Sequence, residues 1–503
     1  MSDQAYEIAA LVVYFAAMIG IGYYAYRQTG NHEDYMLGGR KLPPWTAALS
    51  AGASDMSGWL MMGLPGAIYA AGLVEAWIAI GLTIGAYLNW LFVAPRLRSY
   101  TEVAKNSITI PSFLENRLHD TSRALRVASG AIILVFFTFY VSSMLVAGGQ
   151  FFVIAFDGPY LGGVLLVAIV TLAYTLFGGF LGASLTDVVQ GLMMMFALLV
   201  VPVIAISAVG GLDETTAAIR EVDPNHLSLL GDATLSATTV VGIISAAAWG
   251  LGYFGQPHII VRFMAMRDAA AAGPARRIGI GWMVLSLIGA VACGIIGVAF
   301  FTRTAATLDD PELVVLAMAQ DLLHPVLVGF VFAAVLAAIM STVSSQLIVS
   351  SSAFVEDLYK VFGRDTSERA LLTLGRVCVL AVAVIAGLLA LNPNNTILDL
   401  VAFAWAGFGA SFGPAIILSL FWRKLTNWGA LAGMVAGAVV VFAWDAYGEA
   451  ISGVDLYEIV PGFIANLVVA AVVSRMTYVP NAEMEREFDT AVEVAGRKKV
   501  AAA

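Results

Sequence analysis

Long apolar stretches separated by short polar segments run along the whole chain. A helix of about 20 apolar residues crosses the hydrocarbon core of a bilayer, and the stretches here have roughly that length or more. The pattern predicts an all-α polytopic membrane protein with about thirteen transmembrane helices. The thirteen spans are expected at residues 6–26, 43–71, 73–95, 127–156, 160–180, 185–210, 236–258, 278–302, 325–352, 371–391, 396–422, 428–447 and 458–474.

The spans form one predicted membrane domain over residues 1–477, followed by a polar tail over residues 478–503. Almost all lysines and arginines, Arg262 among them, fall on the side reached by the loops after odd-numbered spans, and only Arg220 and Arg303 fall on the other side. Because basic loops stay in the cytoplasm, we expect the N-terminus outside the plasma membrane and the C-terminus inside. The first span follows acidic residues, so we expect no cleaved signal peptide.

Composition narrows the function further. Hydrophobic residues make up 60% of the chain and charged residues only 12%, which excludes a soluble globular protein. The net charge of −9 is spread over loops and the tail and says little about partners, and we expect no nucleic-acid binding. The sequence has no phosphate-binding glycine loop, which argues against ATP as the energy source. The two cysteines, Cys293 and Cys378, lie within predicted spans, so no disulfide or metal cluster is expected. We predict a transporter driven by an ion gradient rather than an enzyme.

An aspartate lies in the middle of the second span. Asp55 follows Ser54 and precedes Ser57 and Gly58, within a segment rich in small residues. A charge at bilayer depth costs about 2.5–3.5 kcal/mol on insertion scales, so such residues usually face a cavity or a bound ion. Serine and glycine also weaken the helix locally and free backbone carbonyls for a cation. This segment predicts ion-coupled transport.

A second polar cluster lies in the ninth span, where the hydroxyls of Ser341 and Thr342 are adjacent. Such residues in membrane helices often only bond back to their own helix or hold two helices together. If the broken segment around Asp55 packs beside them, hydroxyls and carbonyls supply the oxygen ligands that sodium prefers.

The seventh span is interrupted by three glycines and a proline between Trp249 and Pro257. Broken helices at corresponding positions of two repeats often mark the substrate site of a transporter, although an aromatic belt at the membrane surface is the alternative. Trp249 and Tyr253 are therefore candidate substrate contacts. Tyr140 in the fourth span is a weaker candidate, because a buried tyrosine is often only packing.

Three further charged residues have open roles. Asp187 follows the glycine-rich segment 177–182, which predicts a helix start there, and we favour a structural cap over direct ion binding. Arg40 and Glu75 are candidate gate or loop charges.

Several long stretches closely resemble the sodium:solute symporter family, in particular its sodium/proline symporter branch, over about residues 6–475. They are 34–40 (DYMLGGR), 49–59 (LSAGASDMSGW), 75–81 (EAWIAIG), 249–258 (WGLGYFGQPH), 405–409 (WAGFG) and 419–437 (SLFWRKLTNWGALAGMVAG). The resemblance implies a leucine-transporter-like fold in which spans 2–6 and 7–11 form two inverted five-helix repeats.

The same resemblance implies site residues and cargo. Sodium would be bound by the backbone carbonyls of Ala53, Met56 and Ala338 and the hydroxyls of Ser341 and Thr342. The positions that would influence sodium coupling are Asp55, Ser57, Gly58 and Asp187. The substrate L-proline would lie near Tyr140, Trp249, Tyr253 and Pro257, with Trp59 a less certain neighbour.

We therefore expect sodium-coupled uptake of L-proline by alternating access. The alternatives are a sodium symporter for pantothenate or another carboxylate solute, a solute sensor without transport, and an ion channel. The sensor is disfavoured because no signalling domain follows the last span.

Overall fold

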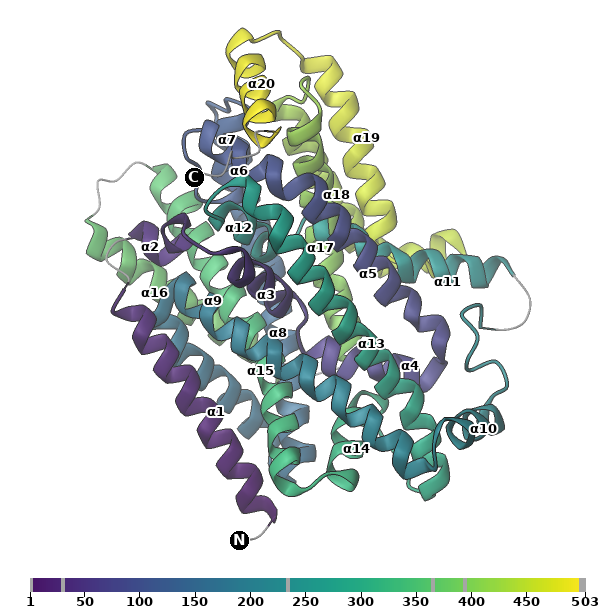
Figure 1. Cartoon of the computed structure of the whole chain (residues 1–503). Coiled ribbons are helices and arrows are strands. Elements are labelled where there is room, and N and C mark those ends of the chain that lie inside the picture. Colours follow the sequence, from purple (N-terminus) through teal and green to yellow (C-terminus); the bar gives the residue numbers. More distant parts are fainter. Residues whose placement is uncertain (1–2, 29–31, 232–235, 363–366, 392–395, 497–503) are drawn as a thin grey trace, which may run out of the picture.

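Helices make up nearly all of the computed structural model, which describes residues 3–28, 32–231, 236–362, 367–391 and 396–496 (Figure 1). Within these residues the one β-contact is a parallel bridge between Leu42 and Met266. The helices in chain order are α1 (Asp3–Tyr26), α2 (His32–Leu37), η1 (Gly38–Arg40), α3 (Pro44–Asp55), η2 (Trp59–Gly63), α4 (Leu64–Ala71), η3 (Leu73–Glu75), α5 (Ala76–Leu88), η4 (Asn89–Val93), α6 (Ala94–Val103), α7 (Ile110–Arg117), α8 (Ala124–Phe156), α9 (Tyr160–Val209), α10 (Leu212–Val222), α11 (Ala237–Ala247), η5 (Ala248–Phe254), α12 (Pro257–Ala265), η6 (Ala269–Ala271), α13 (Ala272–Thr304), η7 (Pro311–Leu313), α14 (Val314–Leu322), α15 (Pro325–Ser352), η8 (Ala353–Tyr359), η9 (Lys360–Phe362), α16 (Glu368–Leu389), α17 (Ile397–Phe421), α18 (Asn427–Ser452), α19 (Ile459–Thr477) and α20 (Ala482–Gly496).

Eleven helical stretches in the described part of the chain are long and apolar enough to cross a membrane. Two shorter apolar helices, Trp59–Ala71 and Tyr160–Leu176, fall within the second and fifth predicted spans. The all-α membrane architecture is thus confirmed, while the count of thirteen stays a prediction.

The second span is broken where the sequence is richest in small polar residues. Helix α3 ends at Asp55, Met56 leaves helical geometry (φ −76°, ψ 78°), and the chain resumes as the π-helical turn η2 and then α4. Serine and glycine have low helix propensity, so a break in the helix costs little free energy in this segment.

The seventh span is broken in the same way. Helix α11 tightens into the 3₁₀ segment η5, Gln256 is extended (φ −78°, ψ 108°), and Pro257 begins α12. Proline fits the first helical position because it lacks the N–H that has no partner there. Helix α12 packs against α3, so the two broken spans meet in the interior of the bundle (Figure 1).

The η5 part of the seventh span lies unusually close to the third span. A Cβ on Gly85 of α5 would lie 2.1 Å from the carbonyl oxygen of Gly250, and one on Gly250 would lie 2.2 Å from that of Gly81. Only glycine permits this approach. The side-chain amide of Asn89 also donates to the carbonyl of Tyr253 at 2.8 Å.

The fifth and sixth predicted spans are joined as α9, which changes direction at Gly179 (φ 57°, ψ −157°). A Cβ there would lie 2.7 Å from the ring of Tyr35, so both the backbone and the space require glycine. Asp187 lies two turns beyond this break. The predicted helix start at Asp187 is therefore wrong, because the helix resumes nearer to Gly179.

The two ends of the bundle carry different features (Figure 1). The first turn of α1 lies at one end with α10 and α14, and α7 and α20 lie at the other. The predicted polar tail forms α20 up to Gly496, and residues 497–503 lie outside the described residues. Helix α20 is docked through Phe488. Its ring contacts the ring of Tyr100 and the guanidinium groups of Arg117 and Arg423.

Candidate functional site

The predicted sodium ligands converge where α3 packs beside α15. The hydroxyl of Ser341 donates to the carbonyls of Ala53 at 2.8 Å and Ala338 at 3.1 Å, and that of Thr342 donates to Ala338 at 3.2 Å. All four residues are fully buried. Two hydroxyls and two carbonyls therefore form an oxygen-only group of the kind that binds sodium. Met56 directly follows the last residue of α3 nearby, and its amide donates to the carbonyl of Gly52.

The contacts within α15 are ordinary back-bonds of serine and threonine to the preceding turn. The bond from Ser341 to Ala53 is different, because it joins the ninth span to the end of the unbroken part of the second span. An ion held there would tie these two spans together.

Asp55 connects the two broken spans. It is 1% exposed, and its Oδ2 accepts a hydrogen bond from the hydroxyl of Tyr253 in η5, while its Oδ1 has no hydrogen-bond partner among the described residues. Its carbonyl accepts from the indole N–H of Trp59 at 3.3 Å. Ser57 accepts from the amide of Trp59 at 3.5 Å, and a Cβ on Gly58 would touch Ala147 and Ile339 at 3.3 Å. The carboxylate therefore holds both breaks in one geometry.

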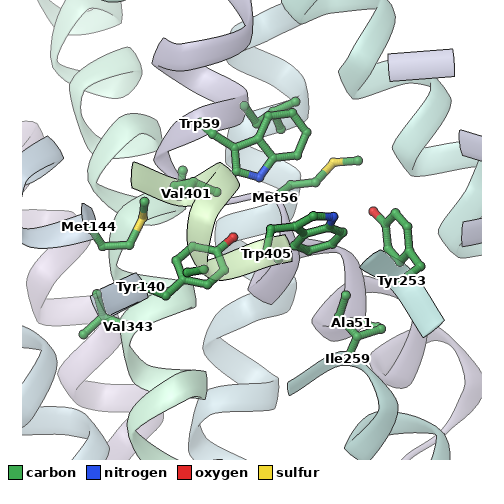
Figure 2. Close-up of a cluster of buried hydrophobic side chains, with 14 of the residues drawn as sticks. Ala51, Met56, Trp59, Tyr140, Met144, Tyr253, Ile259, Val343, Val401 and Trp405 are labelled. Carbon is green, nitrogen blue, oxygen red and sulfur yellow. The ribbon is translucent and has the colours of Figure 1, made fainter. Parts of the chain in front are cut away.

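Aromatic rings surround these breaks (Figure 2). The rings of Trp59 and Trp249 have centroids 6.1 Å apart, and Trp249 stacks on Trp405 at 6.3 Å. Tyr253 meets Trp405 edge to face at 5.3 Å. In Figure 2, Tyr140 and Tyr253 lie on opposite sides of Trp405 with their hydroxyls directed inward. The structure thus brings together the predicted residues Trp59, Trp249 and Tyr253, with Tyr140 across from Tyr253.

Trp405 has a place in this cluster that the sequence did not predict. Its indole N–H donates to the carbonyl of Trp249 at 2.8 Å, and its own carbonyl accepts from the amide of Gln256 at 3.0 Å. A Cβ on Gly252 would lie 1.9 Å from the Trp405 indole nitrogen, which explains that glycine. The signal available was a tryptophan beside two glycines in the eleventh span.

Pro257 lies on the side of the cluster that faces α7. It lines a cavity of about 20 Å³ together with Ile133, Thr109, Val349 and Asp357. That volume holds about one water molecule. The space beside Pro257 on this side of the cluster is therefore small.

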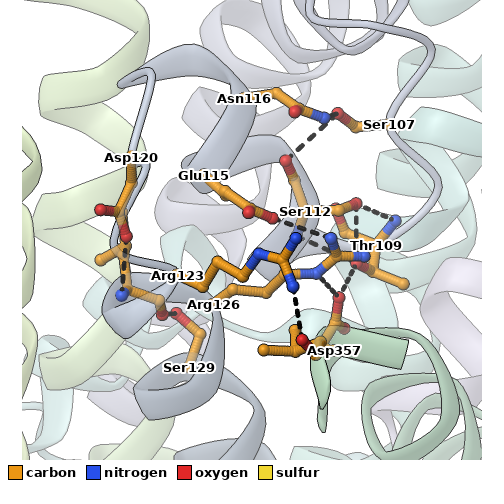
Figure 3. A network of polar contacts seen from close by, with 12 residues as sticks. Ser107, Thr109, Ser112, Glu115, Asn116, Asp120, Arg123, Arg126, Ser129 and Asp357 are labelled. Carbon is orange, nitrogen blue, oxygen red and sulfur yellow. Dashed lines mark hydrogen bonds and ion pairs between the residues drawn. The ribbon is translucent and has the colours of Figure 1, made fainter. Parts of the chain in front are cut away.

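A polar network lies at the same end (Figure 3). The guanidinium of Arg126 contacts Asp357 at 2.9 Å and Glu115 at 2.8 Å. The hydroxyl of Thr109, which caps α7, donates to the same oxygen of Asp357 at 2.8 Å. The network ties α7 and α8 to η8, and no pattern in the sequence indicated this pairing.

Asp187 belongs to a buried ion pair. Its Oδ2 lies 3.1 Å from Nη2 of Arg262 and accepts from Ser50 at 2.7 Å, and Ser345 also contacts it at 3.5 Å. The Asp187 side chain is 0% exposed and that of Arg262 is 1% exposed. The expectation that Arg262 is a loop charge is wrong, because it lies in the last turn of α12 inside the bundle. The signal available was a charge only four residues beyond the predicted end of the seventh span at residue 258.

Arg40 and Glu75 lie apart from the breaks. Arg40 donates to the carbonyls of Ser107 at 2.5 Å and Met264 at 3.2 Å, which ties η1 to α12 and the loop before α7. Glu75 ends η3, beside the point where the amide of Leu73 donates to the carbonyl of His226. Their proposed roles as gate or loop charges stay predictions.

Comparisons with known proteins place these features in a family. A model of the sodium:solute symporter family matches residues 35–437. The high-affinity proline transporter PutP of Bacillus subtilis (strain 168) is 54% identical over 473 residues, covering 94% of this chain and 98% of the relative. The osmoregulated proline transporter OpuE of the same organism is 50% identical, covering 98% and 99%. The sodium/proline symporter of Staphylococcus aureus (strain JH9) is 48% identical, covering 97% and 96%.

Solved structures show the same fold. The chain is similar to a Na⁺-coupled sialic acid symporter in a substrate-bound outward-open state, with a TM-score of 0.79, 19% identity and coverage of 94% and 98%. It is also similar to the nucleobase-cation-symport-1 transporter Mhp1, with a TM-score of 0.53, 14% identity and coverage of 91% and 98%. The leucine-transporter-like fold class expected from the sequence is thereby confirmed.

Proposed function

Because the chain belongs to the sodium:solute symporter family, we propose that it takes up L-proline together with sodium by alternating access. The observation that carries this proposal is the meeting of two broken spans, where an oxygen-only group lies beside an aromatic cluster. Relatives of 48–54% identity that carry the name of proline transporter or sodium/proline symporter support the cargo.

Sodium would bind where Ser341 and Thr342 face the carbonyls of Ala53 and Ala338, with Met56 as a further ligand. Binding there would fix the end of α3. Because Asp55 accepts a hydrogen bond from Tyr253, it would also fix the position of Tyr253 in the substrate site. Each ligand then favours binding of the other, which is the thermodynamic basis of coupling.

The energy supply is sufficient for accumulation. A tenfold sodium gradient supplies about 1.4 kcal/mol, and one charge that crosses 100 mV adds about 2.3 kcal/mol. Their sum of roughly 3.7 kcal/mol supports a few-hundredfold accumulation of a zwitterion at one sodium per solute.

We also propose that the chain acts in the plasma membrane without chemical conversion of its cargo, with the N-terminus outside and the C-terminus cytoplasmic. The start of α1 and α20 lie at opposite ends of the bundle, which supports termini on opposite sides of the membrane (Figure 1), and the basic loops set the direction. The membrane domain would be residues 1–477, with α20 on its cytoplasmic face.

The test is uptake of labelled L-proline into vesicles that contain the purified protein, with and without an inward sodium gradient. Accumulation that requires sodium is the expected result. Accumulation without sodium would refute sodium as the coupling ion. Displacement of labelled proline by unlabelled pantothenate would indicate that pantothenate or another carboxylate solute is the substrate. Saturable binding without uptake would identify a sensor, and sodium current without solute dependence would identify a channel.

A further inference from the structure

His258 carries two polar atoms that the protein leaves without partners. The residue is 0% exposed, and neither Nδ1 nor Nε2 makes a hydrogen bond within the described residues. A neutral imidazole offers one donor and one acceptor, and buried polar atoms of this kind normally have a partner because each orphan costs about 1–3 kcal/mol. The ring therefore has a hydrogen-bonding capacity that the rest of the protein does not use.

The ring lies at the edge of the aromatic cluster. It meets Tyr140 edge to face with ring centroids 6.1 Å apart, and Phe137 at 5.6 Å. The hydroxyl of Tyr140 also has no hydrogen-bond partner among the described residues. Two rings with orphan polar atoms therefore adjoin, and Figure 2 shows the Tyr140 hydroxyl directed inward, toward Trp405.

Packing alone does not explain a histidine here. The backbone of α12 is held by Arg262, whose guanidinium donates to the His258 carbonyl at 2.5 Å, and this bond does not involve the ring. A phenylalanine would fill the same apolar contacts with Phe137 and leave nothing unsatisfied. The polar atoms of the ring thus have a role outside the protein's own hydrogen bonds.

The surroundings favour a negative group. His258 is the second residue of α12, and the first turn of a helix carries a partial positive charge. Tyr253, which lies across Trp405 from Tyr140, offers the reverse character, because its partner Asp55 retains an oxygen without a hydrogen-bond partner among the described residues. An aromatic wall with a donor-rich side and a carboxylate side matches a small zwitterion with an apolar ring.

We propose that His258 and the Tyr140 hydroxyl form the subsite for the carboxylate of the transported amino acid. This inference rests on the proposed function, since it assumes that the substrate is L-proline. The ring N–H donates to one carboxylate oxygen and the tyrosine hydroxyl to the carboxylate as well. Orphan atoms on both residues then gain partners when substrate binds, so the site discriminates against analogues without a carboxylate.

The experiment compares two ligands across a small set of variants. L-Proline and L-prolinamide, which lacks the carboxylate charge, compete with labelled proline for the purified wild type and for H258F. We expect H258F to lower the affinity for L-proline about ten- to hundredfold. The affinity of H258F for L-prolinamide should stay within about threefold of the wild-type value. The matched control is F137L, which alters packing on the same ring but removes no polar atom, and it should leave the ratio of the two affinities unchanged.

Two conservative series keep the test decisive if H258F folds poorly. H258N keeps an N–H near Nδ1 and H258Q keeps one near Nε2, so one of them should retain most of the discrimination and thereby identify the donor nitrogen. Y140F, which is nearly isosteric, should show the same selective loss for proline. Variants that weaken both ligands equally, or neither, would overturn the subsite. A wild type that does not bind proline would instead refute the proposed function.

Discussion

Removal of Asp187 should destabilise the bundle by leaving Arg262 as an unpaired buried charge. The two side chains are almost fully buried and their charged atoms lie 3.1 Å apart. At an effective dielectric constant of about 20, their attraction is about 5 kcal/mol before desolvation is subtracted. Loss of one partner of such a pair typically costs about 3–5 kcal/mol. We therefore expect D187N to lose about 3–5 kcal/mol of unfolding free energy.

A double-mutant cycle separates this cost from the worth of the pair. D187N, R262Q and the double variant are purified, and their unfolding free energies are measured by titration with a denaturing detergent. The double variant should lose less than the sum of the two single variants, because it leaves no lone charge. S345A is the control, since it removes one hydroxyl from the same cluster and should cost only about 1 kcal/mol.

The outcome also decides the role of Asp187. Strict additivity in the cycle would refute a coupled ion pair. If D187N is as stable as wild type but needs far more sodium for uptake, the residue acts in sodium coupling and the structural reasoning is wrong.

Three further predictions concern other parts of the molecule. S341A and T342A should each raise the sodium concentration for half-maximal uptake with little change in thermal stability, and an unchanged sodium dependence in both would remove them from the ion site. Burial raises the pKa of Glu312 from 4.5 to about 7, so its stabilising contribution is fully present below pH 4.5 and is lost as the pH rises through about 7; the melting temperature of wild type should fall relative to E312Q over this range, and parallel curves would contradict it. F488A should detach α20 and expose it to limited proteolysis, because loss of a buried phenylalanine costs about 3–5 kcal/mol, whereas V492A on its more exposed face should not.

The sequence alone predicted those parts of the site in which a residue is unfavourable in its local surroundings. Asp55, Ser341 and Thr342 are polar residues in apolar spans. Because polar groups are costly to place in a membrane, they indicate a functional role before any contact is known. The break at Pro257 was visible for the same reason, because glycine and proline act on the backbone where they stand.

The rest depended on contacts between distant segments. Arg262 looked like a loop charge because its partner Asp187 lies 75 residues earlier in the sequence, and spacing does not encode that pairing. Trp405 reads as ordinary packing until its indole is seen to bond Trp249. The sequence predicted only a polar tail after residue 477. The docking of α20 became visible only from the contacts of Phe488 with the rest of the protein.

The backbone contact between α5 and η5 limits how the transporter can move. Helices separated by layers of side chains can slide, but Gly85 and Gly250 meet with no such layer between them. We therefore expect η5 of the seventh span to travel with α5 of the third span as one rigid body. A pair of spectroscopic labels on these two segments would keep a constant separation through the whole cycle, and would serve as an internal ruler against which every other helix displacement is measured.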